Sequence, residues 1–289
     1  DNLRLLFYNL DYQNKPHFKA FFNEKEHTRT LKIEPHENAV NINTFPKKEI
    51  GDTFFTTILN TSEINGLILN TTIKEKHQKL KKYKGKIIVK QNSLVNKPSK
   101  QYKETLKATF ISPTPAMPNL GKRLQKLIVE KSKKPIVTAL KCIDSNIQDI
   151  ILDVNGMIYF DGLTPLIPIN LAGDGIKRIL SILVTISDNK NGIVLIDEID
   201  NGLHFSSQAT LLKALMEIAK SYNVQIFATT HNYETLKKLK EVLADESMEA
   251  YKNDVKIFTL RKLKDNIIKA YPYDYEALDY ILEQSIEIR

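Results

Sequence analysis

The chain has 289 residues, of which 42% are hydrophobic and 26% are charged, so it is long enough and apolar enough to fold around a sizeable core. Its single cysteine excludes an internal disulfide and a multi-thiolate metal site, and no stretch reaches the roughly 18 consecutive apolar residues that a membrane span needs. The composition therefore predicts a folded, water-soluble protein of a reducing compartment, which we expect to be the cytoplasm.

The net charge of +8 is concentrated in one part of the chain. Residues 71–141 hold 19 lysines and arginines against 3 acidic residues, a local +16, so the rest of the chain sums to −8. A basic segment of this kind is typical of a nucleic-acid surface, although a solvated lysine-rich surface produces the same pattern. We therefore expect salt-sensitive DNA binding through two stretches, from Lys74 to Lys107 and from Lys122 to Lys134.

Residues 1–60 alternate short apolar runs with polar turns, a pattern that predicts antiparallel strands. The runs are Leu5 to Tyr8, Phe18 to Phe22, Leu31 to Ile33 and Phe54 to Leu59. Residues 61–145 form a second region, a basic α/β insert. There we expect helices around 72–83 and 119–142 and strands around 86–90 and 105–111, with a proline cluster at 113–118 before the second helix.

The pattern changes in the third region, residues 146–289. Two apolar runs joined by Asn155-Gly156 predict a β-hairpin, because this dipeptide suits a tight turn. Helices over 174–187, 206–222 and 233–243 then alternate with strands over 192–196 and 224–228, followed by an edge hairpin and a closing helix from residue 274. Strand and helix in alternation predict an α/β fold with a mainly parallel sheet covered by helices.

Two acidic residues follow the apolar run Ile193 to Ile196, at the expected carboxyl end of a central strand. Open parallel sheets bind ligands at that end. Adjacent carboxylates repel each other unless a cation is bound, so we predict that Asp197 holds Mg²⁺. Glu198 would then be the general base that activates a water for attack on a phosphoryl group. The alternative is an acidic turn that merely follows a strand.

The next predicted strand ends in Thr229-Thr230-His231-Asn232. If the two strands are neighbours in the sheet, His231 lies beside Glu198 and could contact the γ-phosphate or the attacking water. The alternative is a surface histidine, with Thr230 or Asn232 capping the helix that follows.

Glycines precede the first of these helices, in the segment Asn170 to Arg178. Glycine lets the backbone approach an anion, and the free N–H groups of a helix N-terminus favour phosphate. Lys177 and Arg178 are unfavourable in a first helical turn unless an anion or a carboxylate compensates them, which favours a phosphate site. An ordinary glycine turn is the alternative.

Together these segments resemble the motifs of ABC-type ATPases. Leu171 to Arg178 is similar to the signature motif, Ile193 to Glu198 to the Walker B motif, Ile199 to His204 to the D-loop, and Thr229 to His231 to the switch histidine. Over residues 147–245 the sequence most resembles the prokaryotic OLD (overcoming lysogenisation defect) and SMC-related group, often described as AAA ATPases. The resemblance implies a P-loop NTPase core, ATP and Mg²⁺ binding, and a head-to-head homodimer around two ATP molecules. It implies nucleotide contacts for Gly173, Asp174, Gly175, Lys177, Arg178, Asn201 and His204.

The sequence departs from this family at three points. The signature serine would fall at Gly173, and the D-loop aspartate would fall at His204. No Gly-x-x-x-x-Gly-Lys-Ser/Thr occurs, and the nearest pairs are Gly85-Lys86 and Gly121-Lys122. Because the chain opens at Asp1 in a strand-like run, we expect the phosphate loop to lie upstream, with residues 1–60 forming the strand-rich part of the first ATPase lobe.

These motifs and the family resemblance predict an ATP-hydrolysing ABC-type ATPase that dimerises on ATP and acts on DNA or on a nuclease partner. By family analogy its setting would be phage defence or DNA repair. The alternative is a non-hydrolysing scaffold or regulatory subunit that keeps the fold. A stand-alone nuclease is weakly supported, because no further carboxylate cluster accompanies Asp197, Glu198 and Asp200.

Overall fold

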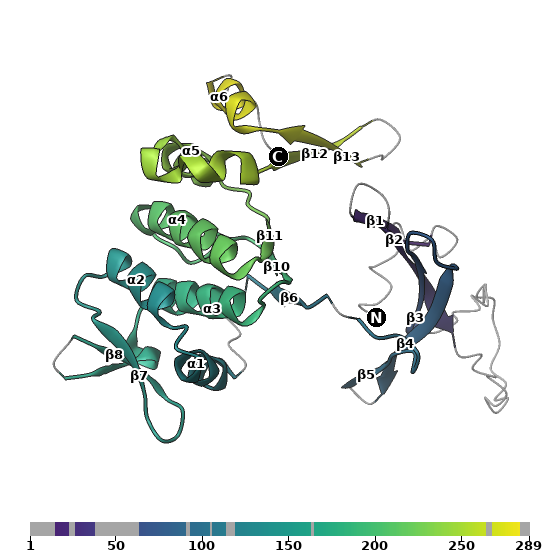
Figure 1. Cartoon of the computed structure of the whole chain (residues 1–289), viewed down its shortest axis with the longest axis horizontal. Helices are drawn as coiled ribbons and strands as arrows, with labels where there is room; N and C mark the ends of the chain where they lie inside the picture. The colour runs from purple at the N-terminus through teal and green to yellow at the C-terminus, as the bar shows by residue number, and fades with distance from the viewer. Residues whose placement is uncertain are drawn as a thin grey trace, which may run out of the picture. The chain divides into compact units, whose positions relative to one another are not determined.

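The computed structural model divides the chain into two compact units, Asp1–Glu104 and Thr105–Arg289 (Figure 1). The boundary lies inside residues 61–145, which the sequence suggested as a single insert. The structure describes residues 15–22, 27–37, 64–90, 93–104, 106–113, 119–162, 165–263 and 268–283. The strands expected over 5–8 and 54–59 lie outside these ranges.

The first unit contains a five-stranded antiparallel sheet with its strands in chain order. The strands are β1 (His17–Phe22), β2 (His27–Glu37), β3 (Ile64–Lys74), β4 (Lys81–Lys90) and β5 (Ser93–Lys97). The helix expected over 72–83 is wrong, because this range holds the end of β3, a turn and the start of β4. The β-branched run Thr71 to Ile73 favours a strand, and His77 has a φ of 60° that a helix does not allow.

The second unit contains a three-stranded parallel sheet in the order β11-β10-β6. The strands are β6 (Ala108–Ile111), β10 (Ile193–Ile196) and β11 (Gln225–Ala228), so all three predicted strands are confirmed. Ile196, the last residue of β10, pairs with Ile111 and Ala228. The three strands therefore end together at one edge.

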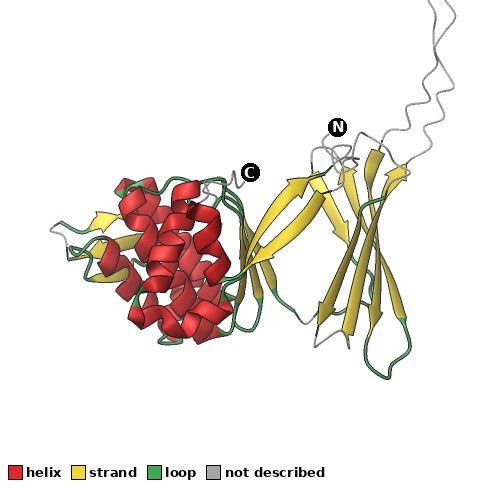
Figure 2. Cartoon of the chain, turned by 90° about the horizontal axis from the view of Figure 1, so that it is seen from above, coloured by secondary structure: helices red, strands yellow, loops and turns green. Residues whose placement is uncertain are grey.

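Five helices lie on one face of this sheet (Figure 2). They are α1 (Leu120–Val129), α2 (Lys134–Ile143), α3 (Asp174–Asp188), α4 (Phe205–Tyr222) and α5 (Tyr233–Ala244). The core between the helices and the sheet includes Leu124, Leu140, Leu180, Val194 and Leu211, each at most 1% exposed. One long helix over 119–142 was expected, but the chain breaks into α1 and α2, because Lys131 is left-handed and Pro135 opens a new helix.

Among the described residues, the opposite face of the parallel sheet carries exposed apolar side chains. Phe110, Leu195 and Phe227 are paired side by side across the three strands and are 61%, 39% and 51% exposed. Parallel sheets are normally covered on both faces. This apolar row therefore marks a surface that another layer can cover.

The remaining elements of the second unit are small. They are β7 (Asp149–Leu152), β8 (Ile158–Asp161), β9 (Ile167–Pro168), the 3₁₀ helices η3 (Ile169–Leu171) and η4 (Glu246–Asp254), β12 (Ile257–Lys262), β13 (Ile268–Tyr273) and α6 (Tyr275–Glu283). Both predicted hairpins are confirmed, β7 with β8 and β12 with β13. The first turn is longer than two residues, because the Asp153 carboxylate accepts hydrogen bonds from the backbone N–H groups of Asn155 and Met157. No described helix has the length and apolar character needed to cross a bilayer.

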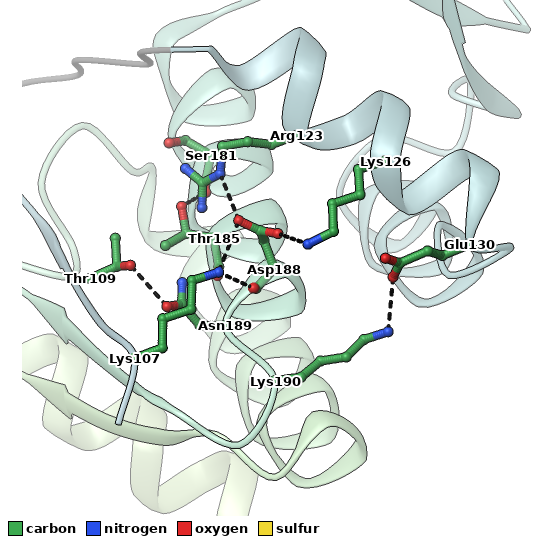
Figure 3. Close-up of polar contacts among 10 residues, drawn as sticks. All are labelled: Lys107, Thr109, Arg123, Lys126, Glu130, Ser181, Thr185, Asp188, Asn189 and Lys190. Carbon is green, nitrogen blue, oxygen red and sulfur yellow. Dashed lines mark hydrogen bonds and ion pairs between the residues drawn. The ribbon is translucent and has the colours of Figure 1, made fainter. Parts of the chain in front are cut away.

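A cluster of basic side chains fixes the end of α3 (Figure 3). The Asp188 carboxylate lies 2.8 Å from Lys126 Nζ, 3.3 Å from Lys107 Nζ and 3.5 Å from Arg123 Nε. Burial raises the pKa of Asp188, but the hydrogen bond and charge of Lys126 and the charge of Lys107 outweigh burial, so the net pKa lies below its usual value. These cations, which fall within or beside the stretches expected to bind DNA, have a structural partner.

Candidate functional site

The acidic pair lies at the carboxyl end of β10, tied to the end of β11. The Thr229 hydroxyl donates to Asp197 Oδ1 at 2.6 Å and accepts from the Glu198 backbone N–H at 2.9 Å. Backbone hydrogen bonds from Thr229 to Ile196 and from Ile199 to Thr229, both 2.9 Å, add to this connection. Since β10 and β11 are neighbours, as the predicted site requires, the two loops share one edge of the sheet.

The loop after β11 carries His231. Its neighbour Thr230 donates to Asp200 Oδ1 at 2.6 Å, and the Asn232 side chain caps α5 by accepting from the Glu234 N–H at 2.9 Å. The predicted capping role of Asn232 is therefore confirmed. The His231 side chain is exposed at this edge, where a ligand can reach it.

Arg178 does not face solvent, although it was expected to contact nucleotide. The residue is 3% exposed, and its guanidinium donates to four backbone carbonyl groups. The acceptors are Ser112 and Pro113 after β6 (Pro113 at 3.2 Å), Asp197 at 3.0 Å and Glu198 at 3.2 Å. Arg178 therefore connects the first turn of α3 to the acidic loop. Burial lowers its pKa, whereas the charges of Glu198 and Asp197 raise it.

The charges of Lys177 and Arg178 do not favour a phosphate site as the sequence analysis suggested, because the chain itself compensates both. Lys177 Nζ pairs with Asp174 Oδ1 at 3.0 Å, one turn earlier on the same helix, and carbonyl oxygens surround Arg178. Both cations thus have acceptors within the chain. Gly173 is the N-cap of α3 and makes no side-chain cap, so the backbone N–H groups of the first turn remain the feature suited to an anion.

A cavity of about 340 Å³ joins the glycine segment to the D-loop-like segment. Its lining includes Gly173, Gly175, Gly202, Leu203 and His204, with Ile143 and Asp144 at the end of α2. A Cβ at Gly175 would lie 3.3 Å from the Gly202 carbonyl oxygen, so the two segments approach closely. The structure therefore brings Gly173, Gly175 and His204 to one hollow. Asn201 instead donates to the Pro113 carbonyl at 3.3 Å.

The two Gly-Lys pairs do not form phosphate loops. Gly85-Lys86 lies in the middle of β4. Gly121 opens α1, but a Cβ at this position would lie 2.2 Å from the Gly156 carbonyl oxygen, so that loop covers the helix start.

The donor set fits a magnesium ion held mainly by a substrate. No group of three metal-binding side chains is found among the described residues. Mg²⁺ in phosphoryl-transfer sites is bound by one or two carboxylates together with substrate phosphates and water, which Asp197 and the open edge can provide.

The sequence analysis missed the roles of Thr229, Thr230 and Arg178. Two threonines directly after a buried strand were visible as a polar cluster. Their hydrogen bonds to Asp197 and Asp200 depend on the pairing of β10 with β11, two strands that are distant in the sequence.

Comparisons with known proteins identify the family of the chain. Residues 5–237 match the family model described as "AAA domain, putative AbiEii toxin, Type IV TA system". A relative named ATP/GTP phosphatase from Helicobacter pylori is 30% identical over 145 residues, which cover 48% of this chain and 38% of the relative. The chain therefore spans less than half of that protein.

Two further proteins are similar to this chain. An uncharacterized protein, MJECL11, from Methanocaldococcus jannaschii is 33% identical over 98 residues, which cover 34% of this chain and 82% of the relative. The SMC head domain from Thermotoga maritima has a TM-score of 0.38 and 11% identity over 86% of this chain and 75% of its own. Because this structural likeness is low, the assignment depends on the family match, which covers most of the sequence: the chain belongs to the AAA-domain family that includes the AbiEii-like proteins.

Proposed function

We propose that this chain is the catalytic part of an OLD-like, ABC-type ATPase. Asp197 would hold Mg²⁺, Glu198 would be the general base and His231 would sense the γ-phosphate. The proposal depends above all on one observation, the connection of Asp197 and Glu198 to the neighbouring His231 loop through the Thr229 hydroxyl. Carboxylates and an imidazole at the carboxyl edge of a parallel sheet suit phosphoryl transfer, in which catalysis is mainly positioning and electrostatic stabilisation.

The chain's own contacts orient the base. Glu198 has a φ of 47°, a left-handed conformation that is unfavourable for residues other than glycine. Thr229 binds its N–H group and Arg178 its carbonyl group, so both sides of this residue are held. A fixed backbone limits the directions of the carboxylate, as a general base requires. Bound Mg²⁺ would neutralise the charge that develops on the phosphate oxygens.

The first turn of α3 would act on the nucleotide of a second subunit in a homodimer. Gly173, Gly175 and His204 line one cavity, and α3 offers uncapped N–H groups beside it. The exposed Asp174 carboxylate and the half-buried Lys177 form an ion pair that such a nucleotide could rearrange. We keep Asn201 in this set because its loop borders the same hollow.

The phosphate loop would come from an upstream segment. The open face of the parallel sheet supports this part of the proposal, because Phe110, Leu195 and Phe227 form an apolar row that a helix following such a loop would cover. The output would be a conformational change imposed on DNA or on a nuclease partner, in phage defence or DNA repair. A scaffold without hydrolysis is the alternative.

The test is Glu198→Gln in a protein that carries the proposed upstream phosphate loop together with this chain. We expect ATP turnover to fall at least a hundredfold while ATP binding remains and an ATP-bound dimer accumulates in size-exclusion chromatography. Glu217→Gln is the matched control, since Glu217 is an exposed glutamate on α4. Unchanged turnover in Glu198→Gln would exclude Glu198 as the base, and absence of ATP binding by the wild type would favour the scaffold.

A further inference from the structure

The five-stranded sheet of the first unit has two chemically different faces. Residues paired directly across antiparallel strands share a face, as do alternate residues along one strand. The strand pairing therefore assigns Lys82, Lys84 and Lys86 of β4 to the same face as Lys97 of β5. Through β3 and β2 the pairing extends this set to the edge strand β1. Seven lysines with described side chains lie on this face, which we call the basic face: Lys19, Lys32, Lys74, Lys82, Lys84, Lys86 and Lys97.

The opposite face is mainly apolar, although Arg29 and Lys81 also lie on it. Leu31, Leu67, Leu69, Ile73 and Ile87 alternate with the basic positions along β2, β3 and β4. The strand register therefore separates the two kinds of side chain, and it gathers lysines from all five strands on one face of the sheet.

The basic face carries little negative charge of its own. Among the described side chains of its strands, Glu34 is the carboxylate on this face. It lies 3.1 Å from Lys15 Nζ and 3.6 Å from Lys32 Nζ, and the hydrogen bond from Lys15 is the main reason that its pKa is lowered. Glu34 is therefore paired with Lys15 and Lys32, and it does not neutralise the lysines of β4 and β5.

Like charges also lie directly opposite each other. Lys86 of β4 pairs with Lys97 of β5 in the sheet register. Such pairs destabilise a sheet, typically by a few tenths of a kcal/mol or more. A bound polyanion would remove this repulsion.

We propose that the basic face binds the phosphate backbone of duplex DNA without sequence preference. The choice of DNA as the partner rests on the proposed function, in which the ATPase acts on DNA. Binding of DNA to the basic face does not itself require a nucleotide. Alternate lysines of a strand repeat every ~6.8 Å, twice the ~3.4 Å axial spacing of phosphates along one DNA strand. Asn70 and Thr72, which pair with Lys84 and Lys82, add side-chain donors of the kind that bind phosphate oxygens.

The side chains described on this face favour backbone binding, because lysine and threonine are typical phosphate contacts. Arg29, the described arginine of this unit, pairs with Ile73 on the apolar face and forms an ion pair with Glu104. Tyr83 is also on that face, in edge contact with Tyr102. The basic face therefore offers neither a guanidinium fork for guanine nor a row of aromatic rings for single-stranded bases.

The test is fluorescence anisotropy of this chain with a labelled 30-base-pair duplex and no ATP. The variant Lys82→Gln/Lys84→Gln/Lys86→Gln should bind at least tenfold more weakly at 0.1 M salt. Its slope of log affinity against log salt should be smaller by about 2 to 3, because each lost phosphate contact contributes ~0.9. The control is Lys213→Gln/Lys220→Gln/Lys252→Gln, which makes the same charge change where each lysine has an acidic partner. This control should bind like the wild type.

Several results would overturn the proposal. They are wild-type binding that is absent or independent of salt, an unchanged affinity in the β4 variant, and equal losses in the two variants. Tighter binding of a single strand, or of vesicles with anionic lipid, would assign the surface to another partner. Circular dichroism of both variants checks that the fold is kept. The Glu198→Gln protein should bind DNA normally, so failure of the ATPase proposal and failure of this one are distinguishable.

Discussion

Arg178→Met should destabilise the second unit. The guanidinium is 3% exposed and donates to four carbonyl groups, those of Ser112, Pro113, Asp197 and Glu198. Methionine keeps much of the apolar volume but offers no donor. The loops after β6 and β10 would then lose the group that joins them.

The size of the effect follows from two opposing contributions. Each buried acceptor left without a partner costs about 1–3 kcal/mol, although water can reach part of this edge because Asp197 and Glu198 are half-buried. Against this, removing a buried cation avoids a desolvation penalty of several kcal/mol. The Pro113 and Glu198 carbonyls keep hydrogen bonds from the side-chain amide and the backbone N–H of Asn201, so the loss falls mainly on the Ser112 and Asp197 carbonyls. Since a hydrogen bond from a charged donor is worth about 1.5–3 kcal/mol, the four that Arg178 makes outweigh one such penalty, and we expect the free energy of unfolding to fall by about 2 kcal/mol. Arg178→Lys, with three donors on one nitrogen, should recover about half of this loss.

Urea unfolding followed by circular dichroism at 222 nm is the suitable assay, because all the described α-helices lie in the second unit. Lys177→Met is the matched control on the same helix. Its partner Asp174 is exposed, so the loss should stay below about 1 kcal/mol. An Arg178→Met protein as stable as the wild type, or more stable, would show that desolvation dominates and would refute the reasoning.

Three further predictions concern nearby positions. Thr229→Val should lower the free energy of unfolding by about 1–2 kcal/mol in urea, since Asp197 loses a hydrogen bond that an isosteric side chain cannot make; an unchanged midpoint would contradict the role of this hydroxyl. Gly173→Ser should raise stability by a few tenths of a kcal/mol in a thermal melt, because Gly173 has an extended backbone and open space at its Cβ, and serine would supply an N-cap; a lower melting temperature would argue against this geometry. Asp188→Asn should destabilise the protein at pH 7, and the difference from wild type should shrink as the pH falls below about 4. The pKa of Asp188 is lower in the folded state, so its stabilisation is present above about pH 4 and is lost as the pH falls through the folded value. A stability difference from wild type that does not change with pH would contradict the stabilising role of the ionised Asp188 carboxylate.

Most helices and strands of the second unit could be predicted from the hydrophobic periodicity of the sequence. The apolar runs of β10 and β11 and the amphipathic helices between them were visible, since buried strands and helix faces leave local patterns. The secondary structure of the first unit was predicted less accurately. Lysine-rich β4 and the polar end of β3 suggested a helix around 72–83, because lysine is a good helix former and a strand with one solvated face leaves only every second residue apolar. The pairing partners that decide the matter are distant in sequence.

The same limit applied to the acidic site. Asp197, Glu198 and His231 follow strands that are recognisable in the sequence, so their shared edge could be inferred from the rule that parallel strands end together. Arg178 could not be assigned in this way. Its acceptors are carbonyl groups, which every residue has, so no pattern of side chains announces a buried guanidinium site.

The sequence was least reliable in showing which individual basic residues are available to bind an external anion. Counting lysines and arginines correctly located a basic segment, yet Lys107 and Lys126 of that segment lie against Asp188, and Lys177 lies against Asp174. In each case a carboxylate of the same chain supplies the anion. On the sheet of the first unit the register instead places Lys86 opposite Lys97, and Lys86 Nζ lies 3.2 Å from His36 Nε2 rather than against a carboxylate. A cation that lies opposite another cation gains more from an external polyanion than one that already has a carboxylate. The strand register, rather than the number of lysines, therefore indicates where a polyanion would bind.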